Sequence, residues 1–180
     1  MGPPEAGVGE DKRLRWNGTE QFRLMGVWNM NENATHDLAN AWAALWDGDL
    51  TQTPRIISPE FVSHSAALTG GPAADSSGRD LLDGWVSGIH QVLQDLHFSI
   101  ELGPFRDGDI VVIRWQADGT YRGGYPGATA GAGTPIRFFG TDTLRLDTTG
   151  RIAEYWANAD SLWFVQQLGV YEVPALQNAA

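Results

Sequence analysis

The spacing of the apolar residues changes once along this chain, near Asp95, and that change limits the folds open to it. Before this point apolar residues recur at helical intervals, as Leu38, Trp42 and Leu45 do. After it they alternate with period two, which is typical of strands with one buried face. Helices followed by consecutive strands indicate an α+β protein, and the chain shows no internal repeat.

The boundaries of the predicted elements follow from caps, turns and breakers. Thr35 is placed as the N-cap of the first firm helix, and Asp160 as the N-cap of the last. The Gly-rich stretch 123–133 lacks the strand-then-helix context of a phosphate loop, so it is interpreted as a flexible hairpin. The predicted helices are 35–46, 50–57, about 80–93 and 161–168, with a short amphipathic arm over 20–29, and the predicted strands are 97–102, 109–118, 120–124, 136–146 and 152–159.

Asp142 stands out within the strand predicted over 136–146. Its face of the strand is otherwise apolar, with Phe138 and Leu144 at period-two spacing, while Arg137 and Arg145 fall on the other face. Burying an unpaired carboxylate is costly, so such a group is normally paired, protonated or lining a solvated pocket. A carboxyl group in apolar surroundings has a raised pKa and can exchange protons near neutral pH. The alternative is a structural Asp bonded to a neighbouring loop.

Charge and composition limit the kinds of molecule that this protein is expected to bind. The 180 residues carry a formal net charge of −10, which argues against nucleic acids and anionic membranes as partners. No apolar run approaches the roughly 20 residues of a membrane span, and the N-terminus lacks the apolar core of a signal peptide. The chain has no Cys, which excludes a thiolate metal site and a thiol nucleophile. We therefore expect a cytoplasmic protein without nucleic-acid or membrane partners.

An ordered set of short segments resembles the SnoaL-like polyketide cyclase family over roughly residues 33–170. These segments are Pro59-Glu60-Phe61-Val62-Ser63-His64, Gly78-Arg79-Asp80, Arg114-Trp115, Gly119-Thr120-Tyr121, Gly150-Arg151-Ile152-Ala153-Glu154-Tyr155-Trp156, Asp160 and Gln167-Leu168-Gly169. The resemblance implies an α+β cone shared with nuclear transport factor two and ketosteroid isomerase. In that fold a curved antiparallel sheet wraps around N-terminal helices, a C-terminal helix follows, and a deep apolar cavity remains.

The resemblance also implies a homo-oligomer, expected here to be a dimer, and no metal or organic cofactor. It divides the chain into an N-terminal extension over 1–32 that is partly disordered or arm-like, a cone domain over 33–170 and a C-terminal tail over 171–180. The outer face of the predicted sheet keeps sizeable groups such as Val112 and Phe139, which favours an oligomer because such a face tends to be covered.

The name-giving members of this family close a ring by an intramolecular aldol condensation, using a His on one strand and an Asp on the next. Carried over by position, that His falls on Asp142 and that Asp falls on Ala157. The chain therefore lacks the His/Asp pair and keeps a carboxylate at one of the two places. What the resemblance implies here is acid/base chemistry in a cavity, not the aldol reaction itself.

Other side chains are candidates for the same cavity. His64 matches a His that the family places near it, and could act as a base or orient a carbonyl group; the alternative is a His that bridges helix and loop. Tyr121 and Tyr155 are candidate donors to a developing oxyanion, or else core aromatics. The predicted catalytic residues are Asp142, His64 and Tyr121, and the predicted substrate-binding residues are Trp85, Trp115, Phe138, Tyr155 and Asn158. No His/His/carboxylate cluster has metal-ligand spacing, so no metal is expected.

Three functions remain open from the sequence. The first is a cofactor-independent cyclase or isomerase of secondary metabolism, acting by acid/base chemistry on a hydrophobic polyketide- or terpenoid-type small molecule. The second is a hydratase, dehydratase or epoxide-opening enzyme, which typically needs a second carboxylate or an Arg beside the first. The third is a non-catalytic module that binds a small molecule or assembles with a partner.

Overall fold

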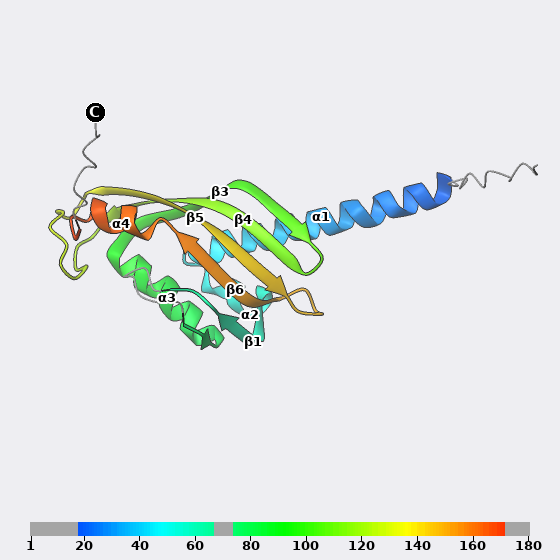
Figure 1. Ribbon diagram of the computed structural model, residues 1–180, viewed down its shortest axis with the longest axis horizontal. Coiled ribbons are helices and arrows are strands. Elements are labelled where there is room, and N and C mark those ends of the chain that lie inside the picture. The colour runs from blue at the N-terminus through cyan, green and yellow to red at the C-terminus, as the bar shows by residue number, and fades with distance from the viewer. Residues whose placement is uncertain (1–17, 67–73, 172–180) are drawn as a thin grey trace, which may run out of the picture. The chain divides into compact units, whose positions relative to one another are not determined.

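A computed structural model describes residues 18–66 and 74–171, with side chains from residue 32 onward (Figure 1). In chain order the elements are α1 (Gly18–Trp46), the 3-10 helix η1 (Leu50–Gln52), α2 (Thr53–Ile56), β1 (Ile57–Ser63), β2 (Ser76–Ser77), α3 (Arg79–Val92), β3 (Leu93–Asp107), β4 (Ile110–Tyr121), β5 (Pro135–Leu146), β6 (Ile152–Ala159) and α4 (Ser161–Gln167). The chain divides after Ala34 into two units, and the second contains every strand and the end of α1. The predicted disorder of residues 1–12 and all but the first residue of the predicted tail lie outside the described residues.

One helix, α1, covers both the predicted arm over 20–29 and the helix predicted over 35–46. The prediction that Thr35 is an N-cap is wrong, because Thr35 lies inside α1, is 3% exposed and accepts a hydrogen bond from Arg106 Nη1 at 3.3 Å. Asn, Glu and Thr lower helix propensity only slightly, so nothing between residues 31 and 35 ends the helix. The helix ends as predicted, before Gly48 at a φ of 102°. None of the described helices is long and apolar enough to cross a membrane.

In the described part of the chain, six strands form one curved sheet that does not close, in the order β2-β1-β6-β5-β4-β3. The strands from β3 to β6 follow one another as an antiparallel meander, which confirms the predicted α+β class. Both β5 and β6 agree with their predicted limits to within one residue. The separate strand predicted over 120–124 is wrong, because Thr120 and Tyr121 continue β4 through Gly119 and pair with Gln94 and Leu93 on β3.

The region predicted as one helix over 50–57 divides into η1, α2 and the first residue of β1. The sequence did not predict β1, because Pro59 and Glu60 interrupt its alternation of buried residues. β1 pairs in parallel with β6, and a register shift between Ile57 and Val62 accommodates the proline, which cannot donate to the ladder. The sheet is therefore antiparallel except for this one pair among the described strands.

The sheet curls around α3, which lies against one of its faces (Figure 1). The helix contacts both β1 and β3, although these strands stand near opposite ends of the strand order. The second half of α1 adds Ala39, Trp42 and Leu45 to the same apolar core. A curved sheet wrapped around helices confirms the predicted cone.

The inner face of β5 contributes to two separate apolar clusters. Ile136 and Phe138 belong to one cluster, and Leu144 and Leu146 to the other. Gly140 and Asp142 stand between them on the same face of the strand. The period-two alternation therefore places one carboxyl group at the junction of two clusters.

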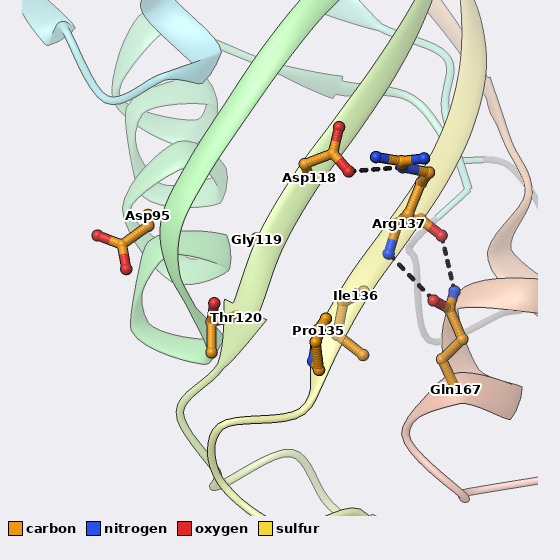
Figure 2. Close-up of a pocket in the computed structure, with 8 residues that line it drawn as sticks. All are labelled: Asp95, Asp118, Gly119, Thr120, Pro135, Ile136, Arg137 and Gln167. Carbon is orange, nitrogen blue, oxygen red and sulfur yellow. Dashed lines mark hydrogen bonds and ion pairs between the residues drawn. The ribbon is translucent and has the colours of Figure 1, made fainter.

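The C-terminal helix α4 is joined to β5 by Gln167 (Figure 2). The side-chain amide of Gln167 accepts a hydrogen bond from Arg137 N at 3.0 Å and donates one to Arg137 O at 2.8 Å. Gln167 thus replaces a strand partner at a point where β6, whose last pair joins Ala159 to Gly140, has already ended. Asp160 occupies the predicted N-cap position, but its side chain makes no cap hydrogen bond.

Candidate functional site

Asp142 is buried on β5, with 2% of its surface exposed. Its cross-strand neighbours are Ile113 on β4 and Ala157 on β6. The two positions to which the family's His/Asp pair was carried over, 142 and 157, are therefore directly opposite each other on adjacent strands. In this chain the pair consists of a carboxyl group and a methyl group.

Two side chains from distant parts of the chain donate hydrogen bonds to this carboxyl group. The indole Nε1 of Trp42, on α1, donates to Oδ2 at 2.8 Å, and the hydroxyl of Tyr155, on β6, donates to Oδ1 at 3.1 Å. Trp42 and Tyr155 are themselves buried, and their rings contact each other edge to face at 5.0 Å between centroids. Asp142 is therefore desolvated but paired, as a buried carboxylate must be.

A third side chain, the indole of Trp115 on β4, lies against the same carboxyl group. It favours the charged form of Asp142, but its Nε1 is buried and does not meet hydrogen-bond geometry with any described residue. The ring lies across Gly140, its cross-strand neighbour, so closely that a Cβ at position 140 would clash with the indole. A glycine is required there because only a residue without a side chain leaves room for the ring.

Burial dominates the acidity of this group. Desolvation raises the pKa of Asp142 from 3.8 to about 6, against the opposing effect of the hydrogen bonds from Trp42 and Tyr155 and of the nearby Trp115 indole. Burial, followed by the neighbouring carboxylate, raises the pKa of Tyr155 well above its ordinary value. At pH 7 the site therefore combines a mostly ionised carboxylate, which can accept a proton, with a neutral phenol, which can donate a hydrogen bond.

Asp142 and Tyr155 line a cavity of about 720 Å³, a volume suited to a drug-sized molecule. Aromatic side chains supply much of its wall, while Ser65, Ser76, Asn158 and Ser161 supply polar groups. The lining residues are Trp46, Ser65, Ala66, Ala74, Ser76, Gly84, Trp85, Gly88, Ile89, Val92, Phe98, Trp115, Tyr125, Phe138, Asp142, Tyr155, Ala157, Asn158, Ala159 and Ser161. The described residues of this lining include no Lys, Arg or His and no second carboxyl group.

All five residues predicted to bind substrate line this cavity, namely Trp85, Trp115, Phe138, Tyr155 and Asn158. The structure also places the predicted catalytic residue Asp142 there, but it does not bring His64 or Tyr121 into the lining. Their roles in catalysis were predicted from the sequence, and the structure gives both of them other contacts.

His64 follows β1 and lies between two carboxylates instead of facing Asp142. Its Nδ1 is 2.7 Å from Asp75 Oδ1, its Nε2 is 3.1 Å from Glu154 Oε2, and its ring stacks on Trp156. Hydrogen bonding to Asp75, opposed by desolvation and aided by Glu154, raises the pKa of His64. Phe61, Ser63 and Ser65 alternate toward the interior, so the residue between Ser63 and Ser65 points away from the cavity.

Tyr121 ends β4 and supports the loop that carries Tyr125. Its buried hydroxyl accepts a hydrogen bond from Tyr125 N at 3.0 Å. Tyr125 lines the cavity, packs edge to face on Phe164, and its hydroxyl makes no hydrogen bond to any described residue. The phenol that reaches the cavity from this hairpin is thus Tyr125, which the sequence did not single out because it lies in a Gly-rich stretch.

Sequence reasoning also missed Trp42 and the two helical glycines of α3. Trp42 was recognised only as a core position, since nothing in its spacing indicates a partner 100 residues away. Gly84 and Gly88, one turn apart on α3, both line the cavity and leave space that larger side chains would fill. The spacing of two glycines at i and i+4 within an apolar helix could have indicated this space from the sequence.

A second pocket, of about 420 Å³, lies near the other ends of β4 and β5 (Figure 2). Arg137 Nε contacts Asp118 Oδ1 there at 2.6 Å. The side-chain amide of Gln167 is hydrogen-bonded to the backbone of Arg137. Because Asp118, Arg137 and Gln167 are held by these contacts, the larger cavity around Asp142 is the candidate site. Among the described residues no three His, Asp or Glu side chains are grouped so as to hold a metal ion.

Comparisons with known proteins agree with this geometry. The model of the SnoaL-like polyketide cyclase family matches residues 36–168. A proposed polyketide cyclase from Bacillus cereus ATCC 10987 has 26% identity and a TM-score of 0.62, over 77% of this chain and 83% of that one. The proposed polyketide cyclase IdmH from Streptomyces antibioticus has 24% identity and a TM-score of 0.65, over 76% of this chain and 99% of that one.

A third solved structure, like the second, supports the fold alone. This protein from Catenulispora acidiphila, described as having a ketosteroid isomerase-like fold, has 21% identity and a TM-score of 0.58, over 76% of this chain and 97% of that one. No curated protein sequence matches the chain. The family match covers most of the chain and includes every residue that lines the cavity. The chain therefore belongs to the SnoaL-like polyketide cyclase family.

Proposed function

We propose that the protein is a cofactor-independent cyclase or isomerase that acts by acid/base chemistry on a polyketide- or terpenoid-type small molecule. One observation carries the proposal. The described lining of an apolar cavity that is large enough for such a molecule holds a single carboxyl group, which is buried and has a pKa of about 6. Asp142 is the proposed catalytic residue, and Trp85, Trp115, Phe138, Tyr155 and Asn158 are the proposed substrate-binding residues.

The proposed reaction begins with removal of a proton from carbon next to a carbonyl group. The ionised Asp142 takes this proton, and the electron pair of the C–H bond passes to the carbonyl oxygen as an enolate. Tyr155 lies within 3.1 Å of the carboxylate and remains a phenol at neutral pH, so it can donate a hydrogen bond to the developing oxyanion. The enolate then attacks an electrophilic carbon in a cyclisation, or is reprotonated elsewhere in an isomerisation.

The alternative of a hydratase, dehydratase or epoxide-opening enzyme has less support. Such chemistry needs a protonated acid, and a second carboxylate or an Arg beside it. The only carboxyl group in the described lining is Asp142, which is mostly ionised at pH 7. Glu154 is bound to His64 and lies 3.5 Å from Arg145, away from the cavity.

The charge of the lining also limits the substrate class. An anionic group would enter without a cationic partner among the described lining residues and would face the carboxylate of Asp142. The cavity therefore suits a neutral molecule whose flat, apolar portion packs between aromatic walls. The third possibility, a non-catalytic binding module, would use the same walls. A measurement of catalytic activity distinguishes it from the proposed enzyme.

The direct experiment is hydrogen–deuterium exchange at carbon next to the carbonyl of neutral fused-ring aryl ketones, followed by NMR in D₂O. The wild-type protein should accelerate exchange, and Asp142→Asn should lose about 10²–10⁴-fold of the acceleration while still binding the ketone. Ketone binding by the wild type without exchange would support the binding module. Equal acceleration by both proteins would exclude Asp142 as the base.

A further inference from the structure

The two oxygens of the Asp142 carboxyl group have chemically different partners. Oδ2 accepts from the indole N–H of Trp42, which is a donor only and cannot accept a proton. Oδ1 accepts from the hydroxyl of Tyr155, which can rotate to donate or to accept. The two oxygens are therefore not equivalent when the carboxyl group gains a proton.

We propose that Trp42 is a positioning residue that holds Oδ2 as a permanent hydrogen-bond acceptor and thereby makes Oδ1 the atom that takes up the substrate proton. A hydrogen bond from a fixed donor is stronger when its acceptor carries charge, so Oδ2 is the oxygen on which protonation is less favourable. Oδ1 can be protonated without an orphaned donor, because the Tyr155 hydroxyl can turn away from it.

This assignment, which rests on the proposed function, connects the proton transfer to the oxyanion donor. The substrate C–H bond breaks, an O–H bond forms on Oδ1, and the negative charge of the carboxylate appears on the substrate carbonyl oxygen. Once protonated, Oδ1 no longer needs the hydrogen bond from Tyr155, whose O–H becomes free to donate to the new oxyanion. The Trp42 bond persists throughout and keeps the carboxyl plane fixed.

Trp42 is held firmly enough for this role. Only 2% of the residue is exposed, and its ring makes edge contacts with Tyr155 at 5.0 Å and with Trp46 at 5.9 Å. The end of α1 is in turn fixed to β3, because Asp47 Oδ1 accepts a hydrogen bond from Phe98 N at 2.6 Å. The indole therefore approaches the carboxylate from an element that the sheet itself holds in place.

Few titratable groups compete with this interaction. Tyr155 on β6 is the titratable side chain in hydrogen-bond contact with Asp142, and Tyr125 is the only other one in the described cavity lining. Trp115 on β4 and Ile113 beside it carry no charge, and α3 presents only uncharged residues to the cavity. A change at Trp42 is thus expected to act on Asp142 without interference from a second ion.

The test is an NMR titration that needs no substrate. In the wild-type protein labelled with ¹³C at Asp carboxyl groups and ¹⁵N at Trp indoles, the Trp42 N–H signal should move through the same midpoint as the Asp142 carboxyl carbon. The Trp46 indole, whose Nε1 makes no hydrogen bond to any described residue, is the internal control and should not follow that midpoint. A Trp42 signal that does not change with pH would overturn the proposal.

A matched pair of variants extends the test. Trp42→Phe should raise the Asp142 midpoint by roughly one pH unit, since it removes a donor that stabilises the charged form more than the neutral form. Trp46→Phe removes an indole of the same cluster and should shift the midpoint much less. Equal shifts in the two variants would contradict the role of Trp42, and the wild-type titration still decides the matter if Trp42→Phe does not fold.

Kinetics separate this proposal from the proposed function. At a pH where Asp142 is ionised in every variant, Tyr155→Phe should lower kcat for ketone exchange, and Trp42→Phe should lower it less. An expected titration combined with no exchange in the wild type would refute the enzymatic proposal and leave the Trp42–Asp142 interaction established. Exchange in the wild type with a pH-independent Trp42 signal would support the enzymatic proposal and refute the role of Trp42.

Discussion

At the scale of single residues, Asp142 is a group whose burial opposes the stability of the fold. Its folded-state pKa of about 6 lies above the value of 3.8 that applies when it is exposed. Between these values the folded state binds more protons than the unfolded state, so this contribution to stability falls as pH rises from about 4 to about 6. Above pH 6 the ionised group costs about 3 kcal/mol, from roughly two pKa units at 1.36 kcal/mol each.

Asp142→Asn removes this cost. The Asn side chain can still accept from Trp42, and its amide can donate to the Tyr155 oxygen. We expect the variant to unfold at the same or a higher denaturant concentration than the wild type at pH 8, and to lose any such advantage at pH 4. Asp142→Ala is the control and should be destabilised by about 1–3 kcal/mol, because it leaves two buried donors unpaired. An Asn variant as unstable as the Ala variant at pH 8 would argue against the raised pKa.

The residue scale also shows what a sequence can and cannot predict. Asp142 was predictable because it is polar in an uninterrupted apolar alternation, and the lining by Phe138 and Tyr155 followed from the same period. Its bond to Trp42 was not, because that contact depends on how the end of α1 enters the curled sheet. The outward direction of His64 was available from the alternation of Phe61, Ser63 and Ser65, but Pro59 hid the strand that gives this alternation its meaning.

At the scale of elements, the contact between β4 and β5 depends on Gly140. A Cβ there would clash with the Trp115 ring, so Gly140→Ala should displace the indole from the cavity wall and destabilise the fold by about 1–3 kcal/mol. Gly84→Ala is a matched control, since a Cβ at this helical position meets nothing within 4 Å and should stabilise α3 by about 0.5–1 kcal/mol. Denaturant unfolding and Trp fluorescence measure both changes; equal stabilities would contradict the close packing.

His64 connects β1 to the segment before β2 and to β6. Because its pKa is raised, its ion pairs with Asp75 and Glu154 stabilise the fold below about pH 6.5, and this contribution is lost as pH rises through the raised value. We expect His64→Gln to lower the melting temperature at pH 6, by an amount corresponding to about 0.2–1 kcal/mol, and to have less effect at pH 9. A difference that grows with pH would refute this assignment.

The elements that were predicted well share an unbroken local pattern. β5, β6 and α4 have regular spacing and clear end signals, whereas the predicted break in α1 relied on Thr35, a residue that a helix tolerates. β1 was missed because it is held by a parallel pairing with β6, a contact across some 90 residues that leaves no local signature. Tertiary pairing, which local patterns do not encode, accounts for these differences.

At the scale of the whole molecule, the acidic chain presents an apolar ligand cavity whose described lining carries one carboxylate and no cationic side chain. We predict that a neutral methyl ester of a fused-ring aromatic acid binds at pH 8 at least about tenfold more tightly than the free acid, because the acid would bury an unpaired anion. Quenching of Trp fluorescence reports binding of both ligands. Tighter binding of the free acid would show that a cation absent from the described lining serves the site.

The predicted homodimer also belongs to the scale of the whole molecule. Sedimentation at micromolar concentration tests it: a dimer is expected, and a monomer would contradict the prediction.

The central claim is that Asp142 is the ionised base of this cavity, and the pH dependence of ketone exchange tests it most directly. The rate constant under kcat/KM conditions should rise tenfold per pH unit at low pH, level off above a midpoint near 6, and fall by about 10²–10⁴-fold in Asp142→Asn. A rate that is independent of pH between 5 and 8 in the wild type, or a profile that Asp142→Asn retains, would contradict the account.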